Sequence, residues 1–263
     1  MYLGLTGKKI VITGASRGLG LATAKCFLSE GAKVLLCARN ERLLAQNQAL
    51  LASTYGQENC YFVAADICTA TGLNSLLTAV CDYFGRIDSI ICNLGSGKSS
   101  PTLMESDEDW SKMFELNFFS AVNTVRKLIP YFNLQEDAVS AMSSITFVNT
   151  ICSSEALGAP VTYSSSKSAL LSYAKSISKL LAKQNIRVNT VSPGNIIFPG
   201  STWEEKLQKN KVEVEVMLEN EVALKRFATP EEVAKVITFI SSSAASFVCG
   251  SNWIVDGGQL RSY

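Results

Sequence analysis

The sequence predicts an α/β protein with a doubly wound, seven-stranded parallel sheet and helices on both faces. Short apolar, β-branched runs alternate with longer helical stretches along the 263 residues. Such runs are typical of parallel strands that are covered on both faces. A glycine-rich turn follows the first run, and no linker, low-complexity stretch or internal repeat divides the chain. We therefore expect a single domain over residues 1–263.

Seven segments have the character of buried strands. They are residues 9–13, 33–38, 61–66, 89–93, 145–150, 186–192 and 252–256. Helical patterns lie at about 18–30, 41–54, 71–84, 111–130, 162–184 and 230–243. Residues 196–228 depart from the alternation, because this stretch is charged and rich in Glu and Lys. We interpret it as an excursion over the edge of the sheet that acts as a substrate lid.

Composition excludes several classes of partner. Apolar residues make up 47% of the chain, which is enough for a sizeable core, and the net charge is +1. That charge gives no reason to expect nucleic acid or an anionic membrane surface as a partner. The first residues do not have the pattern of a signal peptide, and no apolar run approaches the ~20 residues of a membrane span. We expect a soluble cytoplasmic protein.

The cysteines and the absence of histidine restrict the chemistry. Eight cysteines are scattered without a C-x-x-C pair, and the chain contains no histidine. A Ser-His-Asp or Cys-His centre is therefore excluded, and a zinc site is not expected. We interpret the cysteines as buried free thiols in a reducing compartment and predict no metal site.

The glycine-rich turn is the first candidate binding site. Gly14, Gly18 and Gly20 follow the first strand as G-x-x-x-G-x-G, and Ser16, Arg17 and Leu19 complete the turn. Glycine lets the backbone approach a pyrophosphate, and the N-terminus of the following helix attracts anions. A tight connection without a ligand is the plainer alternative. The position of the turn after the first of seven strands favours a dinucleotide site.

The end of the second strand predicts which dinucleotide binds. An acidic residue there would hold a ribose hydroxyl, whereas this chain has Arg39. Arg39, with Arg17 as a second positive charge, favours a 2′-phosphate and therefore NADP(H). A solvated arginine at a helix start is the alternative. Asp66, at the end of the third strand, is expected to bond the adenine amino group or to cap the next helix.

Tyr163 and Lys167 are the leading catalytic candidates. They lie four residues apart in Y-S-S-S-K, and with Leu170 and Ala174 they form one face of the helix expected at 162–184. A lysine on a covered face needs a partner or a polar cavity, unless it extends to water. An ammonium one turn away would lower the pKa of the phenol from its usual value of about 10. Tyr163 would then exchange a proton with a substrate oxygen.

Four motifs in register resemble the short-chain dehydrogenase/reductase family across essentially the whole chain. They are TGASRGLG at 13–20, CNLG at 92–95, YSSSK at 163–167 and SPGNI at 192–196, and GSNWIVDGG at 250–258 is similar to the last strand of that family. The resemblance implies a Rossmann-type sheet, a nicotinamide cofactor, a homotetramer or homodimer, and a Ser-Tyr-Lys centre assisted by an asparagine. Length and motif spacing are most similar to the 3-oxoacyl-carrier-protein reductases and related ketoreductases.

The resemblance also assigns residues. It implies that Lys167 holds the nicotinamide ribose, and that Asn117 binds a water that returns protons to Lys167. On the sequence alone a structural role for Asn117 is nearly as well supported. Further cofactor contacts implied by the motifs are Ile67, Asn93, Gly95, Tyr163, Pro193, Gly194 and Ile196. The chain departs from the family pattern at Cys92, Leu94, Thr150 and Phe198.

The hydroxyl partner of Tyr163 has more than one candidate. In the family this group is a serine at the end of the fifth strand, about a dozen residues before the tyrosine. Thr150 lies 13 residues before Tyr163, and Ser153 and Ser154 lie 10 and 9 before it. Because the β-branched run ends at Thr150, we predict Thr150, with Ser153 as the second candidate.

These observations favour an NADP(H)-dependent reductase of a ketone. Its substrate would be a small carbonyl or alcohol compound, which the resemblance allows to be carrier-bound. An NADP-binding regulator with weak activity is the alternative, supported by the departures from the family pattern. A nucleotide-sugar epimerase or dehydratase is less well supported, because the chain lacks T-G-x-x-G-x-x-G and a larger C-terminal domain. The lid contains three apolar side chains, Phe198, Trp203 and Leu207. They either line an apolar substrate pocket or pack the lid itself.

Overall fold

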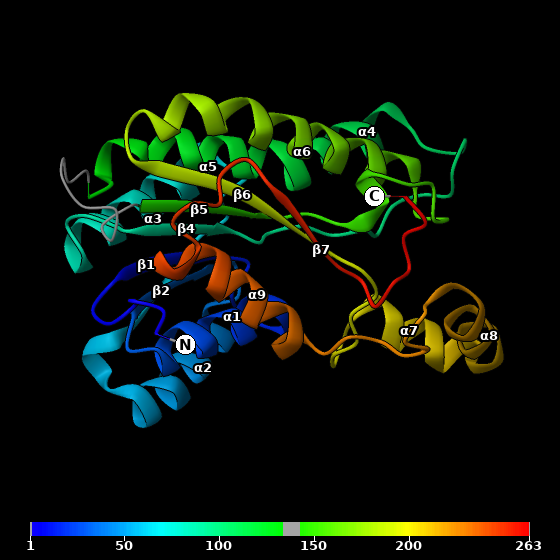
Figure 1. Cartoon of the computed structure of the whole chain (residues 1–263), viewed down its shortest axis with the longest axis horizontal. Helices are drawn as coiled ribbons and strands as arrows, with labels where there is room; N and C mark the ends of the chain where they lie inside the picture. The colour runs from blue at the N-terminus through cyan, green and yellow to red at the C-terminus, as the bar shows by residue number, and fades with distance from the viewer. Residues whose placement is uncertain (1, 134–142, 263) are drawn as a thin grey trace.

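The computed structural model describes residues 2–133 and 143–262 and contains the expected sheet (Figure 1). Seven parallel strands lie in the order β3-β2-β1-β4-β5-β6-β7. Their bounds are β1 Lys9–Thr13, β2 Lys33–Ala38, β3 Cys60–Ala64, β4 Ser89–Cys92, β5 Ser143–Val148, β6 Ile186–Pro193 and β7 Asn252–Val255. The predicted doubly wound fold class is confirmed.

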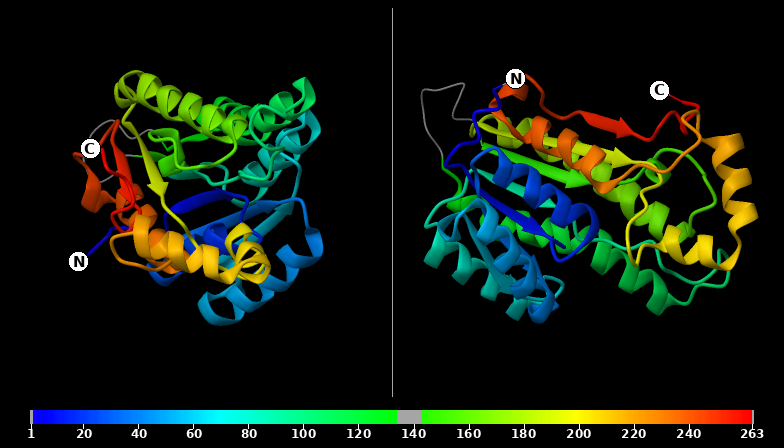
Figure 2. Two further views of the ribbon diagram at one scale, coloured as in Figure 1. Left: turned by 90° about the vertical axis from the view of Figure 1, so that its right-hand side faces the viewer. Right: turned by 90° about the horizontal axis from the view of Figure 1, so that it is seen from below.

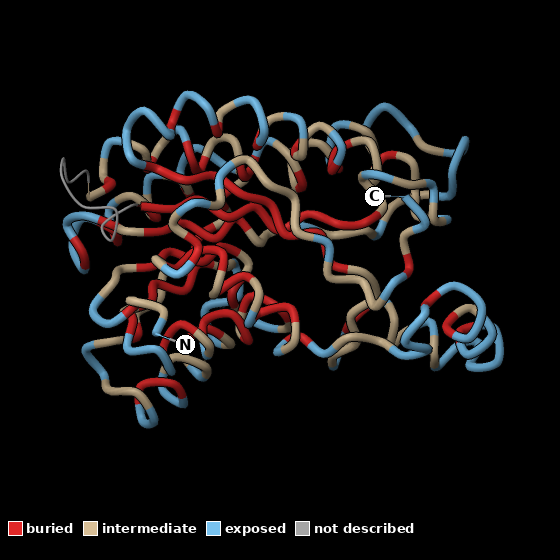
Figure 3. The backbone as a smooth tube through the Cα atoms, in the orientation of Figure 1, coloured by how far each residue is buried: buried red, intermediate tan, exposed pale blue. Residues whose placement is uncertain are grey.

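Helices cover both faces of the sheet. One face carries α3 (Ala70–Tyr83), α4 (Asp107–Phe114), α5 (Ser120–Leu128) and α6 (Val161–Ala182). The other face carries α1 (Gly18–Ser29), α2 (Glu41–Tyr55) and α9 (Pro230–Ser241). Figure 2 shows the same layers from the end of the sheet. Buried residues follow the strands between these layers (Figure 3) and form a separate apolar cluster on each face of the sheet.

One expected helix is divided. The pattern at 111–130 predicts a continuous helix, but the structure has α4, a π-helical turn η2 at Glu115–Phe119, and then α5. The helix also begins earlier than expected, because Ser106 and Asp109 form a capping box at its N-terminus. A π-helical turn inside an α-helix is frequently found at functional sites. Here it contains Asn117.

Residues 196–228 form two helices, α7 (Thr202–Lys209) and α8 (Lys211–Glu221), which extend beyond the sheet (Figure 1). Val214, Leu218 and Val222 are the buried members of a small apolar cluster of their own. Trp203 and Leu207 pack against that cluster. The sequence left open whether these side chains line a pocket or pack the segment itself. Trp203 and Leu207 pack the segment itself.

Two further observations concern the thiols and the helices. The eight cysteines are free, but Cys81 and Cys249 are exposed, so the expectation that all are buried is wrong. In residues 2–133 and 143–262, no helix is both long and apolar enough to cross a membrane.

Candidate active site

The glycine-rich turn joins β1 to α1 at the carboxyl edge of the sheet. Gly14 and Gly18 have φ angles of 65° and 54°, in the left-handed region that favours glycine. Gly20 has no room for a side chain, because a carbon built there would lie 2.4 Å from the Gly14 carbonyl oxygen. The turn therefore needs all three glycines, two for backbone conformation and one for close packing.

Asn93, just after β4, fastens this turn to the sheet. Its Nδ2 donates to the carbonyl oxygens of Thr13 and Gly14, both at 3.1 Å, and its backbone N–H donates to Thr13 Oγ1 at 3.1 Å. The Asn47 side chain holds the turn from the other side by donating to the Ser16 carbonyl oxygen at 2.7 Å. The turn is thus rigidly placed before any ligand binds.

The N-terminus of α1 faces the space above the turn without a capping side chain. Its N-cap residue, Arg17, makes no side-chain capping hydrogen bond, and Leu19 is buried beneath it. The unpaired N–H groups and the helix dipole favour an anion at this position. The turn therefore fits a phosphate group.

Arg39, the main residue predicted to bind the 2′-phosphate, lies directly after the end of β2. Arg39 is exposed, and its Nη1 lies 3.9 Å from Asp66 Oδ2. Asp66 lies two residues beyond the end of β3, which stops at Ala64, and its Oδ1 accepts from the Cys68 N–H at 3.1 Å. Asp66 does not cap α3, because Thr69 does so. The Arg17 guanidinium lies near the segment before α7, because its Nη1 would lie 3.1 Å from a carbon built on Gly200.

The remaining cofactor candidates line the same edge of the sheet or pack beneath it. Pro193 ends β6, and Gly194 donates its N–H to Val255 at 3.0 Å. Gly194 must be small, because a side-chain carbon there would lie 2.8 Å from the Cα of Asp256. Ile196 pairs with Ala228 in an isolated parallel bridge, and Ile67 is buried in the apolar cluster under α3.

Tyr163 and Thr150 meet at the start of α6. Tyr163 is half-buried in the first turn of the helix, and the Thr150 hydroxyl lies close enough to act on the pKa of the phenol. Thr150 lies two residues beyond β5, which ends at Val148, and it caps the short 3₁₀ turn Ile151–Ser153. The strand thus ends earlier than predicted, but Thr150 is still the hydroxyl beside the phenol.

Ser153 has a different set of partners. Its Oγ donates to the Thr150 carbonyl oxygen at 2.7 Å and accepts from Asn149 Nδ2 at 2.9 Å. These bonds close the loop that carries Thr150. The structure brings Thr150, and not Ser153, to Tyr163.

Lys167 is buried, with only 3% of its surface exposed, and its Nζ donates to the Val148 carbonyl oxygen at 2.9 Å. Gly95 lies against the same ammonium. A side-chain carbon at Gly95 would lie 3.1 Å from Lys167 Nζ and 2.8 Å from Asn117 Oδ1. Lys167, Asn117 and Gly95 therefore converge, and only a glycine fits between the two side chains.

The amide of Asn117 makes three hydrogen bonds to the main chain. Its Oδ1 accepts from the Ser96 N–H at 2.9 Å, and its Nδ2 donates to the carbonyl oxygens of Ser96 and Met113, both at 3.1 Å. The side chain thus fixes the loop that follows β4 to the π-helical turn. This arrangement favours the structural interpretation of the asparagine side chain.

Burial governs the protonation of the two central groups. It raises the pKa of Tyr163 to about 12, against the opposing effect of the Thr150 hydroxyl, and it lowers the pKa of Lys167 to about 8. The spacing alone predicts a lowered pKa for the phenol, and that direction is wrong for this structure. The reason is that removal of the phenol from water is the largest influence on its pKa and outweighs the Thr150 hydroxyl.

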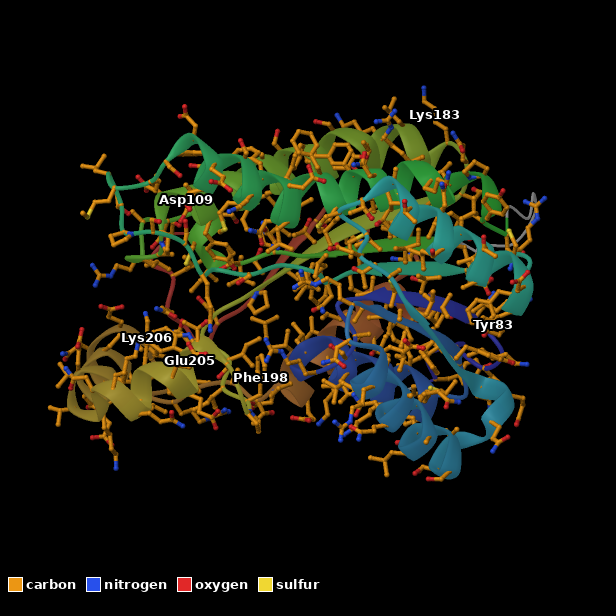
Figure 4. The ribbon with its side chains drawn as sticks, turned by 180° about the vertical axis from the view of Figure 1, so that it is seen from behind. Tyr83, Asp109, Lys183, Phe198, Glu205 and Lys206 are labelled. Atoms are coloured by element: carbon orange, nitrogen blue, oxygen red, sulfur yellow. The ribbon has the colours of Figure 1, made fainter. Side chains whose placement is uncertain are left out.

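The loop after β4 adds polar residues that the sequence motifs did not identify. A carbon built on Gly97 would lie 3.7 Å from the Tyr163 ring, and Ser99 Oγ lies 2.8 Å from Thr162 Oγ1. Lys98 Nζ donates to Glu205 Oε1 of α7 at 2.5 Å. Figure 4 shows Glu205 and Phe198 on the segment that contains α7. A motif search could not find this ion pair, because its members lie 107 residues apart.

Comparison with known proteins finds matches over nearly the whole chain. A family model described as enoyl-(acyl carrier protein) reductase matches residues 14–259. The chain is 33% identical to the isoepoxydon dehydrogenase of Penicillium expansum over 261 residues, 97% of this chain and 95% of that protein. It is 29% identical to the 3-oxoacyl-[acyl-carrier-protein] reductase of Chlamydia pneumoniae, covering 98% of this chain and 99% of that one.

A solved structure extends the comparison to the fold. The crystal structure of L-sorbose reductase from Gluconobacter frateurii, complexed with NADPH and L-sorbose, superposes with a TM-score of 0.91. The two chains share 32% sequence identity, and the match covers 100% of each.

Proposed function

The chain belongs to the short-chain dehydrogenase/reductase family and is an oxidoreductase, and we propose that it uses NADP(H) to reduce a ketone to a secondary alcohol. The observation that carries the proposal is the meeting of Thr150, Tyr163 and Lys167 at the carboxyl edge of the sheet. In doubly wound sheets this edge is where ligands bind. A phenol, a hydroxyl and a buried ammonium are together suited to proton transfer at a carbonyl oxygen.

Tyr163 is the proton donor in this proposal. With its pKa at about 12, the phenol is protonated at neutral pH, as reduction requires. Its proton would pass to the carbonyl oxygen of a ketone whose carbon takes up a hydride, the chemistry that a reduced nicotinamide would supply when bound. Thr150 donates its own hydroxyl hydrogen bond to the same oxygen and so shares the developing negative charge.

Lys167 stabilises what Tyr163 becomes. Its pKa of about 8 leaves the ammonium mainly charged at neutral pH. A positive charge near the phenolate favours proton release from Tyr163. Asn117 supports this arrangement by holding Gly95 and Ser96 beside the ammonium. A water relay from Asn117 to Lys167 stays a proposal from family resemblance.

The described residues fit NADP(H). The glycine turn of Gly14, Gly18 and Gly20 and the uncapped start of α1 would hold the pyrophosphate, with Ser16, Arg17 and Leu19 around it. Arg39 would bind the 2′-phosphate, Asp66 and Ile67 would border the adenine, and Lys167 would hold the ribose. The nicotinamide would lie near Asn93, Gly95, Pro193, Gly194 and Ile196. NADPH in the related L-sorbose reductase supports this assignment.

The 2′-phosphate assignment has a direct test. Arg39→Asp places a negative charge where the phosphate would bind. It also places that charge beside the Asp66 carboxylate. We expect the ratio of kcat/KM for NADPH over NADH to fall by about tenfold or more, since charge-assisted bonds contribute roughly 1.5–3 kcal/mol. Arg42→Asp, on the first turn of α2, is the matched control. An unchanged ratio would show that Arg39 is only a surface residue.

Two substrate classes are to be compared. Resemblance to a 3-oxoacyl-[acyl-carrier-protein] reductase supports a carrier-bound 3-oxoacyl thioester. The polar surroundings of Tyr163, with Ser99, Thr162 and Lys98 nearby, support instead a small polyhydroxylated ketone. The resemblance to L-sorbose reductase points the same way, and we favour this second class.

The decisive experiment follows NADPH oxidation with a panel of both classes. Ketoses and small hydroxyketones form one arm, and 3-oxoacyl thioesters of increasing chain length form the other. Turnover in the first arm, absent in Tyr163→Phe, supports the proposal. Turnover confined to long thioesters would correct the substrate class. NADPH binding with no turnover in either arm would favour a regulator, the alternative function.

The remaining features of the proposal concern assembly and the segment beyond the sheet. We propose that residues 196–228 act as a lid and that the protein is a cytoplasmic homotetramer or homodimer. Exposed apolar side chains, including Phe119 at the end of η2 and Leu180 on α6, support self-association. A light-scattering mass near that of one 28.4 kDa chain at micromolar concentration would contradict the oligomer.

A further inference from the structure

Phe198 places an aromatic ring on the glycine-rich turn. A side-chain carbon built on Gly18 would lie 2.6 Å from both Cε2 and Cζ of that ring. The ring is therefore in van der Waals contact with Gly18, the first residue of α1. Figure 4 shows Phe198 where the α7–α8 segment approaches the half of the sheet that carries α1.

The ring is a poor partner for this helix terminus. The first N–H groups of α1 have no capping side chain, and the end of the helix carries a partial positive charge. A phosphate oxygen satisfies both, whereas an aromatic ring is at best a weak acceptor for N–H groups. An anion that reaches the turn would therefore replace the ring with a better interaction.

The backbone on both sides of Phe198 is fixed. Ile197 donates its N–H to the Ala228 carbonyl oxygen at 3.1 Å, before the ring. Beyond it, the N–H of Ser201 donates to the Phe198 carbonyl oxygen at 2.9 Å, and Phe198 N–H donates to Ser201 Oγ at 3.2 Å. Because the main chain is held, the ring can leave Gly18 by rotation of its own side chain, without movement of α7 or α8.

We propose that Phe198 is a gate on the cofactor site, whose ring occupies the phosphate position over Gly18 and must rotate away before the dinucleotide binds. This inference rests on the proposed use of NADP(H). The half-buried ring gives up its contacts when it rotates, and that cost is subtracted from the affinity for the cofactor. Phe198 thus determines how tightly and how fast the dinucleotide binds.

Binding measurements on the purified protein test the gate. The dissociation constant of NADPH is measured by calorimetry, and its association rate by stopped-flow fluorescence, for the wild type, Phe198→Ala and Phe198→Thr. We expect both variants to bind NADPH about tenfold more tightly, a difference of about 1.4 kcal/mol, mainly through faster association. Adenosine 2′-monophosphate carries the 2′-phosphate but has no 5′-phosphate to place on the turn. It should therefore bind all three proteins equally.

Phe227→Ala is the matched control. Phe227 packs against Trp203 in the same segment, with ring centroids 5.2 Å apart and the ring planes tilted by 47°, so its removal loosens the segment without touching Gly18. NADPH affinity should stay within about twofold of the wild type in this variant. Tighter binding in Phe227→Ala would attribute the effect to a loosened segment and overturn the gate. Thermal melting identifies a variant that fails to fold. If one Phe198 variant fails to fold, the other is sufficient to test the gate.

Each other outcome is also decisive. Weaker NADPH binding in the Phe198 variants would show that the ring packs on the bound dinucleotide, and an unchanged affinity would show that it has no effect; both overturn the gate. Binding by the variants but not by the wild type would support it in its strongest form. If no form of the protein binds NADPH, the proposed cofactor is wrong and the gate fails with it.

Discussion

The start of α6 and the α7–α8 segment both lie near the carboxyl edge of the sheet, but they are held in different ways. Lys167 is buried and donates to the main chain at the end of β5. Thr150 is buried and accepts from the Cys152 N–H in the turn that follows the strand. No residue of α7 is buried, and the segment has only a small apolar cluster of its own. Its ion pair to the loop after β4 is largely exposed.

The difference indicates a division of labour. Proton transfer needs groups held in a fixed geometry and kept from water, and only the main core supplies both conditions. Binding tolerates adjustable contacts, and marginally stable segments are where such adjustment is found. Substitutions at the start of α6 should therefore change kcat strongly, whereas substitutions on α7 should change KM or cofactor affinity modestly.

The largest expected effect is at Tyr163. Tyr163→Phe deletes the proton donor and keeps the ring, so we expect kcat to fall by about 10³-fold. The dissociation constant of NADPH should change little, because the ring still packs beside Gly97. Steady-state kinetics and calorimetry on the same preparation measure both. If the variant retains most of the wild-type kcat, Tyr163 is not the proton donor.

The next effect separates two hydroxyls three residues apart. Thr150→Val keeps the shape and removes the hydroxyl beside Tyr163, and should lower kcat by about 10²-fold. Thr150→Ser should keep most of the activity. Ser153→Ala removes two loop hydrogen bonds, worth about 1 kcal/mol each in stability, and should lower the melting temperature more than it lowers kcat. The reverse pattern would make Ser153 the partner.

A smaller effect comes from the charge on Lys167. Its pKa is lowered to about 8 by burial, so the ammonium is present below that pH and is lost as pH rises through it. We expect kcat for ketone reduction to be level near pH 7 and to fall by up to about tenfold per pH unit above about 8. Tyr163, with a pKa of about 12, does not titrate in this range. A profile that stays flat to pH 10 would contradict a role for the ammonium.

Most of the sheet and part of the site could be predicted because their signals are local. Alternating strands and helices, the glycine turn, and the Tyr163–Lys167 spacing are each contained within a short stretch of sequence. What could not be predicted depends on contacts between distant segments. The Phe198 ring on Gly18 and the Lys98–Glu205 pair join residues far apart in the chain.

The direction of the Tyr163 pKa was missed for a related reason. Sequence spacing indicates that an ammonium is one helical turn away, but it does not indicate how deeply both groups are buried. Nor does it show that Lys167 Nζ is turned to Val148. The division of the helix at 115–119 could not be predicted from the sequence either, because the residues of a π-helical turn have the same apolar pattern as those of an α-helix.

The smallest expected effect concerns the Lys98–Glu205 ion pair, which joins the loop beside Tyr163 to α7. Lys98 holds the pKa of the Glu205 carboxyl below its usual range, chiefly through their hydrogen bond. Both side chains are about half exposed, at 57% and 45%, so solvent screening limits what the pair contributes. Exposed ion pairs are typically worth about 0.2–1 kcal/mol. Lys98→Met and Glu205→Gln should therefore raise KM for the ketone by at most about fivefold and leave kcat unchanged.

A double-mutant cycle shows whether the pair itself is responsible. If it is, the double variant has the same KM as either single variant, and ~0.5 M salt moves the wild type toward that value by screening the pair. Lys112→Met, which removes the exposed i,i+4 pair with Glu108 on α4, is the matched control and should leave KM unchanged. Additive effects in the cycle would mean that Lys98 and Glu205 act separately. A large loss of kcat from either change would mean that α7 belongs to the catalytic geometry, and the division of labour between the two regions would be wrong.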